Sequence, residues 1–267
     1  MRAPEVIPVL SLTTDGPVAV IRFSQPSNVN VITLRWTEEM QVALKNISQD
    51  ANVRAVMLCG AGHGFLAGGD LAYLHRTPPE IAAREADTLI LQLNRVIESI
   101  VALPIPTLAS VHGATAGAGI SLLLACDYAI AAADARFVFA YSQIAATPDG
   151  GLSWTLPRVM GLRKAMEFAF LTRAMTADEA LAAGMVNRCV PASDLALASQ
   201  AMASELAVFP RDAFALTKRM LRESLQRPFS VQLDVERINF RACVRTSDLQ
   251  NAVEAFFNRN KCVTSEN

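Results

Sequence analysis

Two glycine-rich loops carry residue types that could do chemistry in this sequence. The first, GAGHGFLAGGDL, spans residues 60–71, and the second, HGATAGAGI, spans residues 112–120. Each follows an apolar run typical of a strand and opens a helix, so the first helix amides point outward unpaired. Glycine lets the backbone approach a ligand closely, and such amides bind partly anionic oxygen. Taken alone, HGATAGAGI is more typical of a tight strand-to-helix crossover than of a binding site.

An acidic turn in the stretch ATPDGGLSWTLPR, which contains Asp149, is the third candidate. A carboxylate placed near a ligand can act as a general acid or base. However, x-Pro-Asp-Gly-x is also a turn signature, and an aspartate just before a helix is a good N-cap. The residues alone therefore leave a catalytic and a structural interpretation of Asp149 open.

A nucleophilic serine is the least favoured chemistry. Ser121 lies on the helix after the second loop, but His63, His75 and His112 offer no evident triad with it. We interpret Ser121 as a small residue for helix packing and His63 as a loop residue. His112 is expected at a strand end, bonded to backbone.

The composition bounds the kind of protein. The chain has 267 residues, is 52% hydrophobic and has a formal net charge of -1, so it can bury a full core and shows no basic bias for nucleic acid. Its five cysteines are far apart and mostly lie in apolar runs, as expected for reduced, buried thiols. No leader or spanning segment is evident near MRAPEVIPVL or elsewhere, which predicts a cytoplasmic protein without membrane contact.

Strand and helix patterns alternate along the first part of the chain, which predicts a layered α/β body with largely parallel strands. A hairpin is expected around Asp15-Gly16, with helices from about Thr33 to Gln49 and from Pro79 to Ala102. From Asp194 onward only helices are expected, broken at Pro210 and Pro228. We therefore predict a core of residues 1–193 and a helical region of residues 194–267.

The order of the motifs resembles the crotonase superfamily, the enoyl-CoA hydratase/isomerase family. The resemblance rests on FLAGGDL followed by HGATAGAGISLLLACD, and extends from PSNVNVITLRWTEEM to LTRAMTADEALAAGMVNRCVP. It implies a ββα-spiral core that binds acyl-CoA and a C-terminal helical region for oligomerisation and cover of the active site. It also implies a homotrimer or a dimer of trimers, with coenzyme A as part of the substrate, no separate cofactor and no metal.

The resemblance also implies site residues. An oxyanion hole of two backbone amides maps to Gly69 and Ala118. The substrate-binding positions map to Ala67, Gly69, Asp70, Leu71, Ala72, Ala118 and Tyr141. CoA contacts in the N-terminal segment map near Arg22, Asn30 and Arg35. The tail departs from the family pattern at Asn251 and Ala252, which puts CoA contacts by Phe256 and Lys261 in doubt.

Hydratases of this family use two glutamates, whose positions map to Ser121 and about Tyr141. Because neither glutamate is present, the resemblance favours the isomerase branch, in which one acid, here Asp149, moves a proton. The alternatives are hydration, a dehalogenase and a non-catalytic acyl-CoA binder. The dehalogenase branch needs a histidine near Glu98 and a tryptophan near Tyr141, and neither matches. Glu98 is more typical of a solvated helix face than of a second acid.

Overall fold

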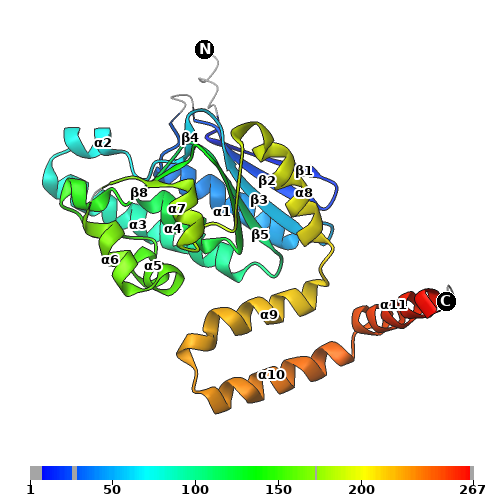
Figure 1. Cartoon of the computed structure of the whole chain (residues 1–267). Coiled ribbons are helices and arrows are strands. Elements are labelled where there is room, and N and C mark those ends of the chain that lie inside the picture. Colours follow the sequence, from blue (N-terminus) through cyan, green and yellow to red (C-terminus); the bar gives the residue numbers. More distant parts are fainter. Residues whose placement is uncertain (1–7, 26–28, 172, 265–267) are drawn as a thin grey trace. The chain divides into compact units, whose positions relative to one another are not determined.

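The computed structural model describes residues 8–25, 29–171 and 173–264, with the side chains of 259–264 outside the description. The chain divides into two compact units after Ala207, and each is described by itself (Figure 1). The predicted boundary lies after residue 193. The difference is the helix α8 (Leu195–Ala207), which packs against strands β3, β5 and β7 of the first unit.

The large sheet of the first unit has the strand order β1-β2-β3-β5-β7-β10. Its strands are β1 (Leu10–Asp15), β2 (Val18–Phe23), β3 (Ala55–Gly60), β5 (Thr107–Val111), β7 (Tyr128–Ala132) and β10 (Arg188–Val190). The strands β1 and β2 form the predicted antiparallel hairpin, and Gly16 supplies its positive φ of 55°. All other neighbours are parallel, as predicted.

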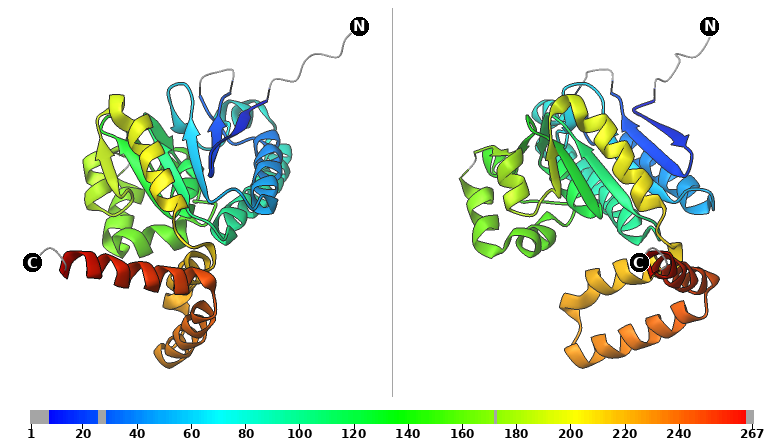
Figure 2. Two further views of the ribbon diagram at one scale, coloured as in Figure 1. Left: turned by 90° about the vertical axis from the view of Figure 1, so that its right-hand side faces the viewer. Right: turned by 45° about the vertical axis from the view of Figure 1, so that its right-hand side comes forward.

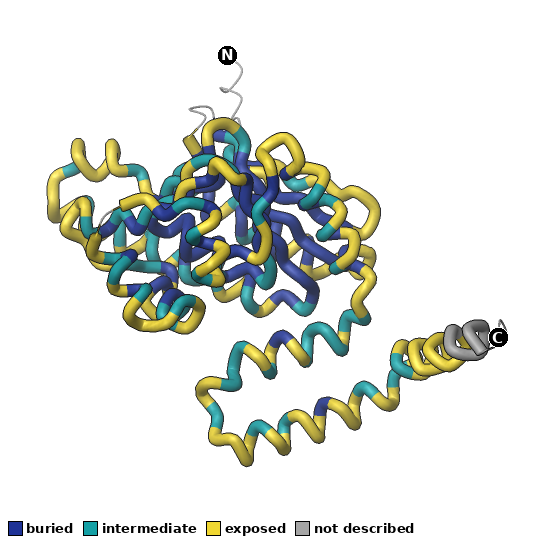
Figure 3. The backbone as a smooth tube through the Cα atoms, viewed as in Figure 1, coloured by how far each residue is buried: buried dark blue, intermediate teal, exposed yellow. Residues whose placement is uncertain are grey.

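Both faces of the large sheet are covered. Alternate side chains of a strand point to opposite faces, so Val18 and Val20 pack in one apolar cluster while Ile21 and Phe23 pack in the other. The first cluster lies under α8, and the second lies under α1 (Leu34–Gln49) and α3 (Pro79–Ala102) (Figure 2). The buried residues therefore concentrate in and around the strands (Figure 3).

A smaller sheet has the strand order β4-β6-β8-β9. Its strands are β4 (Gly64–Leu66), β6 (Ala114–Ala116), β8 (Arg136–Val138) and β9 (Met175–Thr176), of which the first three are parallel. Glycines allow an unusually close approach here. A Cβ on Gly119 would lie 2.1 Å from the carbonyl oxygen of Leu66, and one on Gly113 would lie 2.1 Å from that of His63.

Short helices connect these strands. They are α2 (Leu71–Arg76), α4 (Ala118–Ala125), α5 (Leu152–Met160), α6 (Leu162–Phe170) and α7 (Ala177–Ala182), with 3-10 turns η1 (Tyr141–Ile144) and η2 (Ala192–Asp194). Local capping explains several starts. Thr33 caps α1 through the amide of Trp36, and Thr176 and Glu179 form a reciprocal capping box at α7. The helices predicted at about residues 33–49 and 79–102 are thus confirmed.

The second unit is helical, with α9 (Arg211–Glu223), η3 (Ser224–Gln226), α10 (Phe229–Val244) and α11 (Ser247–Thr264). Pro210 and Pro228 stand at the start of α9 and α10, which confirms the two predicted breaks. A third break, between α10 and α11, was not predicted. The hydroxyl of Thr246 accepts a 3.3 Å hydrogen bond from the Leu249 amide there.

The cysteines only partly follow the expectation of buried thiols. Cys59 and Cys126 are buried, whereas Cys189 and Cys243 are half-buried. Cys262 lies outside the residues whose side chains are described. Among the described helices, none is both long and apolar enough to cross a membrane.

Candidate active site

Three adjacent parallel strands of the small sheet deliver the predicted site residues. The strand β4 ends in the loop that carries Gly69, β6 leads through Gly117 to Ala118, and β8 leads to Tyr141. Parallel strands that are neighbours end at the same edge of a sheet. Residues more than 70 positions apart in the sequence therefore meet at one edge.

The two glycine-rich loops converge at this edge. A Cβ on Gly68 would lie 3.1 Å from the Ala116 oxygen and 3.6 Å from the Ala118 nitrogen. Ala118 is the first residue of α4, where an amide has no partner within the helix. Among the described residues, neither the Gly69 nor the Ala118 amide donates a hydrogen bond. Both are therefore available to a ligand oxygen.

Asp149 lies beside this edge and is not a helix cap. The N-cap of α5 is Gly151, which makes no side-chain capping bond. The Asp149 Oδ1 atom instead accepts a 2.7 Å hydrogen bond from the hydroxyl of Tyr141. Of the two structural roles that the sequence offered for Asp149, the cap is therefore wrong, whereas the turn is present, because the Leu152 amide donates to the Asp149 carbonyl oxygen across 3.1 Å.

The surroundings of Asp149 and Tyr141 shift the pKa of both side chains. Burial raises the pKa of Asp149, and the hydrogen bond from Tyr141 partly offsets that rise by favouring the ionised carboxylate. Burial, followed by the charge of Asp149, raises the pKa of Tyr141. The phenol therefore stays protonated at neutral pH and donates its hydrogen bond to the carboxylate of Asp149.

Ser121 lies behind the acid. Its Oγ atom donates a 3.0 Å hydrogen bond to the carbonyl oxygen of Asp149. The next residue, Gly150, is buried, and a Cβ there would lie 2.8 Å from the Ser121 Cβ. Ser121 is thus more than the packing residue that the sequence suggested, because it fixes the backbone that carries the carboxylate.

Asn30 is a structural residue that the sequence interpretation missed. It is 2% exposed, and its Nδ2 atom lies 2.9 Å from the Ala61 oxygen and 3.0 Å from that of Gly64. The Ala67 amide donates to the Asn30 carbonyl oxygen. Asn30 therefore holds both ends of β4 in place and does not offer its side chain to CoA. A polar residue inside the apolar run VNVI was the available signal.

The other predicted residues take different places. Asp70 caps α2 by accepting a 3.0 Å hydrogen bond from the Tyr73 amide, so it fixes the chain just after Gly69. Leu71 and Ala72 follow as exposed residues of the same helix. Ala67 is half-buried between β4 and the glycine pair.

The other residues that the sequence singled out lie away from this edge, and each is either exposed or bonded to a local partner. Glu98 is exposed on α3, as a solvated helix face predicts. The Nε2 atom of His112 lies 3.1 Å from the Gly62 oxygen, which confirms its backbone role. Arg35 pairs with Glu39 at 2.8 Å on α1, and Arg22 is exposed on β2.

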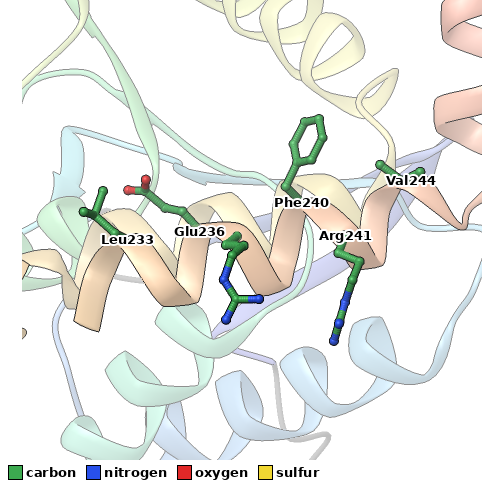
Figure 4. Close-up of a pocket in the computed structure, with 6 residues that line it drawn as sticks. Leu233, Glu236, Phe240, Arg241 and Val244 are labelled. Atoms are coloured by element: carbon green, nitrogen blue, oxygen red, sulfur yellow. The ribbon is translucent and has the colours of Figure 1, made fainter. Parts of the chain in front are cut away.

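The remaining places to consider are a metal site and the helices of the second unit. The described residues contain no cluster of metal-binding side chains. A shallow hollow on α10 is lined by one helix face of the second unit, with Leu233, Phe240 and Val244 beside charged side chains (Figure 4). Phe256 is exposed on α11, and the Lys261 side chain lies outside the description.

Comparison with known proteins identifies the group to which this arrangement belongs. The family described as Enoyl-CoA hydratase/isomerase matches residues 13–266. The chain belongs to this family. It is 33% identical to a 1,2-epoxyphenylacetyl-CoA isomerase of Escherichia coli K12, over 93% of this chain and 94% of the relative. It is equally 33% identical to a probable enoyl-CoA hydratase of Rhodobacter capsulatus, over 91% and 92%.

The fold agrees with that of solved members of the enoyl-CoA hydratase/isomerase family. A putative enoyl-CoA hydratase/isomerase from Mycobacterium abscessus superposes with a TM-score of 0.88 at 30% identity, covering 94% of this chain and 96% of the other. The predicted crotonase-like α/β core with a helical C-terminal region is therefore confirmed. The names of relatives include both hydratases and isomerases, so the reaction has to be argued from the residues of this site.

Proposed function

We propose that the protein is an acyl-CoA isomerase that converts a 3-enoyl-CoA into a 2-enoyl-CoA, with Asp149 as its acid and base. The observation that carries the proposal is the carboxylate of Asp149, since Asp70, the acid next to Gly69, is engaged in capping α2. No hydrogen bond or ion pair among the described residues joins a second carboxylate to Asp149. Ser121 and Tyr141 occupy the positions at which the family resemblance expects the two hydratase glutamates.

Double-bond migration needs only one carboxylate. The ionised Asp149 takes a proton from C2 of the thioester, and the C–H electron pair becomes part of a dienolate. The protonated acid then returns the proton to C4, and the remaining electrons form the C2=C3 double bond. A general acid/base of this kind contributes about 10²- to 10⁴-fold to a rate. The raised pKa of Asp149 makes its carboxylate a stronger base than an ordinary aspartate.

The two free amides can stabilise the negative charge that develops on the thioester oxygen. During the reaction the thioester oxygen becomes an enolate oxygen, and the Gly69 and Ala118 amides would donate to it. A preorganised donor of this type stabilises a transition state by about 2.7 to 4 kcal/mol. Coenzyme A enters as part of the substrate, and no separate cofactor is needed. A homotrimer or dimer of trimers and a cytoplasmic location stay predictions from the sequence.

The test is incubation with 3-enoyl-CoA and, separately, 2-enoyl-CoA in deuterated water, following double-bond position, hydration and deuterium uptake. We expect migration without hydration, and its loss in Asp149→Asn with CoA affinity retained. Asp134→Asn, the same change in an exposed turn, serves as the matched control and keeps full activity. Net hydration of 2-enoyl-CoA would overturn the proposal, as would chloride release from 4-chlorobenzoyl-CoA. CoA binding without any turnover would instead indicate a non-catalytic binder.

A further inference from the structure

The aromatic ring of Tyr141 lies between the backbone that leads to Ala118 and the carboxylate of Asp149, and its neighbours hold it in place. The side chain is 7% exposed. Its ring packs edge-to-face on Phe139 at a centroid distance of 5.3 Å, and Phe139 packs in turn on Phe168 at 6.1 Å. Edge-to-face contacts of this kind favour one ring orientation. The phenol therefore has a fixed direction.

The same ring lies close to the backbone next to the oxyanion hole. A Cβ on Gly117 would lie 3.7 Å from the Tyr141 Cζ atom and 3.9 Å from its hydroxyl oxygen. Gly117 directly precedes Ala118, whose amide is one of the two free donors. One rigid side chain therefore spans from the oxyanion hole to the carboxylate of Asp149.

The hydroxyl of Tyr141 distinguishes the two oxygens of that carboxylate. It occupies Oδ1 at 2.7 Å, whereas no hydrogen bond among the described residues involves Oδ2. Ser121 donates to the backbone carbonyl oxygen of the same residue. No described side chain forms an ion pair with Asp149. Its orientation is thus set by one neutral donor on the side chain and one on the backbone.

We propose that Tyr141 is a positioning residue that fixes Asp149 relative to the Ala118 amide and leaves Oδ2 as the oxygen that carries the proton. This inference rests on the proposed isomerisation. The C2–H bond breaks and the proton moves to Oδ2, then from Oδ2 to C4, so no oxidant, reductant or further reactant is consumed. The phenol keeps its own proton throughout, because its hydrogen bond to Oδ1 is needed in both steps.

The decisive variant is Tyr141→Phe, which retains the ring contact with Phe139 and its place beside Gly117 but removes the donor. We expect kcat to fall about 10-fold with KM unchanged, since the lost bond orients the acid and does not bind the substrate. The decrease of kcat at low pH, called here the acid limb of its pH profile, should move to higher pH. The reason is that the lost hydrogen bond favoured the ionised carboxylate. Tyr128→Phe makes the same change in the other apolar cluster and should leave kcat and its pH profile unchanged.

A measurement without turnover separates this inference from the proposed function. The carboxyl carbon of Asp149 can be followed by ¹³C NMR in aspartate-labelled protein and assigned by its absence in Asp149→Asn. In Tyr141→Phe its titration midpoint should rise. If the wild-type protein fails to isomerise but the midpoint rises, the proposed function fails while the contact to Asp149 stands. An unchanged midpoint or an unchanged acid limb would overturn the positioning role.

A second variant distinguishes the loss of this hydrogen bond from a general disturbance of the site. Replacement of Tyr141 alone by 3-fluorotyrosine gives a more acidic phenol of nearly the same size, which should be a stronger donor to Asp149. The acid limb should then move to lower pH, opposite to the shift in Tyr141→Phe. Shifts in the same direction for both variants would contradict the inference, because damage to the fold would not depend on donor strength.

Discussion

The hydroxyl of Ser121 donates to the carbonyl oxygen of Asp149 across 3.0 Å. A residue on the buried helix α4 therefore anchors the backbone of the proposed acid, 28 positions along the chain. The contact is possible because the residue directly after the acid lacks a side chain. Gly150 has a positive φ of 57° and lies directly against Ser121.

We predict that Gly150→Ala destabilises the protein by about 3 kcal/mol, as the sum of a left-handed backbone penalty and a steric clash. The matched control is Gly151→Ala, where φ is also positive at 77° but no atom lies within 4 Å of the added Cβ. That variant should lose only about 1 kcal/mol from backbone strain. Urea unfolding measures both, and equal losses would show that the contact with Ser121 has no steric consequence.

The approach of the two glycine-rich loops depends on Gly119. We predict that Gly119→Ala lowers the free energy of unfolding by about 3 kcal/mol, because its Cβ would lie 2.1 Å from the Leu66 carbonyl oxygen. The comparison is Gly69→Ala, which meets no atom within 4 Å and should change stability by less than about 0.5 kcal/mol. Thermal unfolding of the two variants side by side is the measurement. A tolerated Gly119→Ala would contradict the close contact between α4 and β4.

Asn30 should contribute to stability through its buried amide. Asn30→Ala leaves the carbonyl oxygens of Ala61 and Gly64 without this donor, and unsatisfied buried groups cost about 1 to 3 kcal/mol each. We expect a loss of about 3 kcal/mol in chemical denaturation. Asn46→Ala, on the exposed face of α1, should leave stability unchanged or slightly raised. A loss at Asn30 no larger than at Asn46 would exclude the anchoring role.

The proposed base should give the reaction an acid limb. Asp149 must be ionised to take the proton from C2, and burial raises its pKa above the ordinary value for aspartate. We therefore expect kcat/KM to fall as pH decreases through this raised pKa, at a higher pH than an exposed aspartate would give. Initial rates over a pH series measure the limb. A profile that stays flat down to the ordinary aspartate range would contradict Asp149 as the base.

The raised pKa of Asp149 also predicts how this residue affects the stability of the fold. A carboxyl whose pKa is higher in the folded than in the unfolded protein contributes stability below the unfolded pKa and loses it as pH rises through the folded pKa. At neutral pH the ionised group therefore destabilises the fold. We expect Asp149→Asn to be more stable than the wild type at neutral pH, with the gain shrinking in acid. Denaturant unfolding at neutral and at acidic pH tests this. The stability change in Asp134→Asn should not depend on pH in this way.

The sequence by itself determined the local elements, because their signals lie within a few residues of one another. Asp15-Gly16 indicated the hairpin, and Pro210 and Pro228 indicated the two breaks among the C-terminal helices. The glycine-rich loops and the acid in its turn were also visible, since their residue types are unusual and their order resembles the family. The break before Ser247 was missed because the predicted breaks rested on proline, and here a threonine caps the next helix.

Only the tertiary structure decided what the polar side chains do. In sequence terms Asp149 is an acceptable helix cap and Ser121 a small helix residue. The parallel order of β4, β6 and β8 brings their ends together, and this order depends on contacts between distant segments that no local pattern encodes. That pairing places the Tyr141 hydroxyl on the carboxylate and Ser121 behind it. The distinction between a cap and a half-buried, oriented acid is a consequence of these long-range contacts.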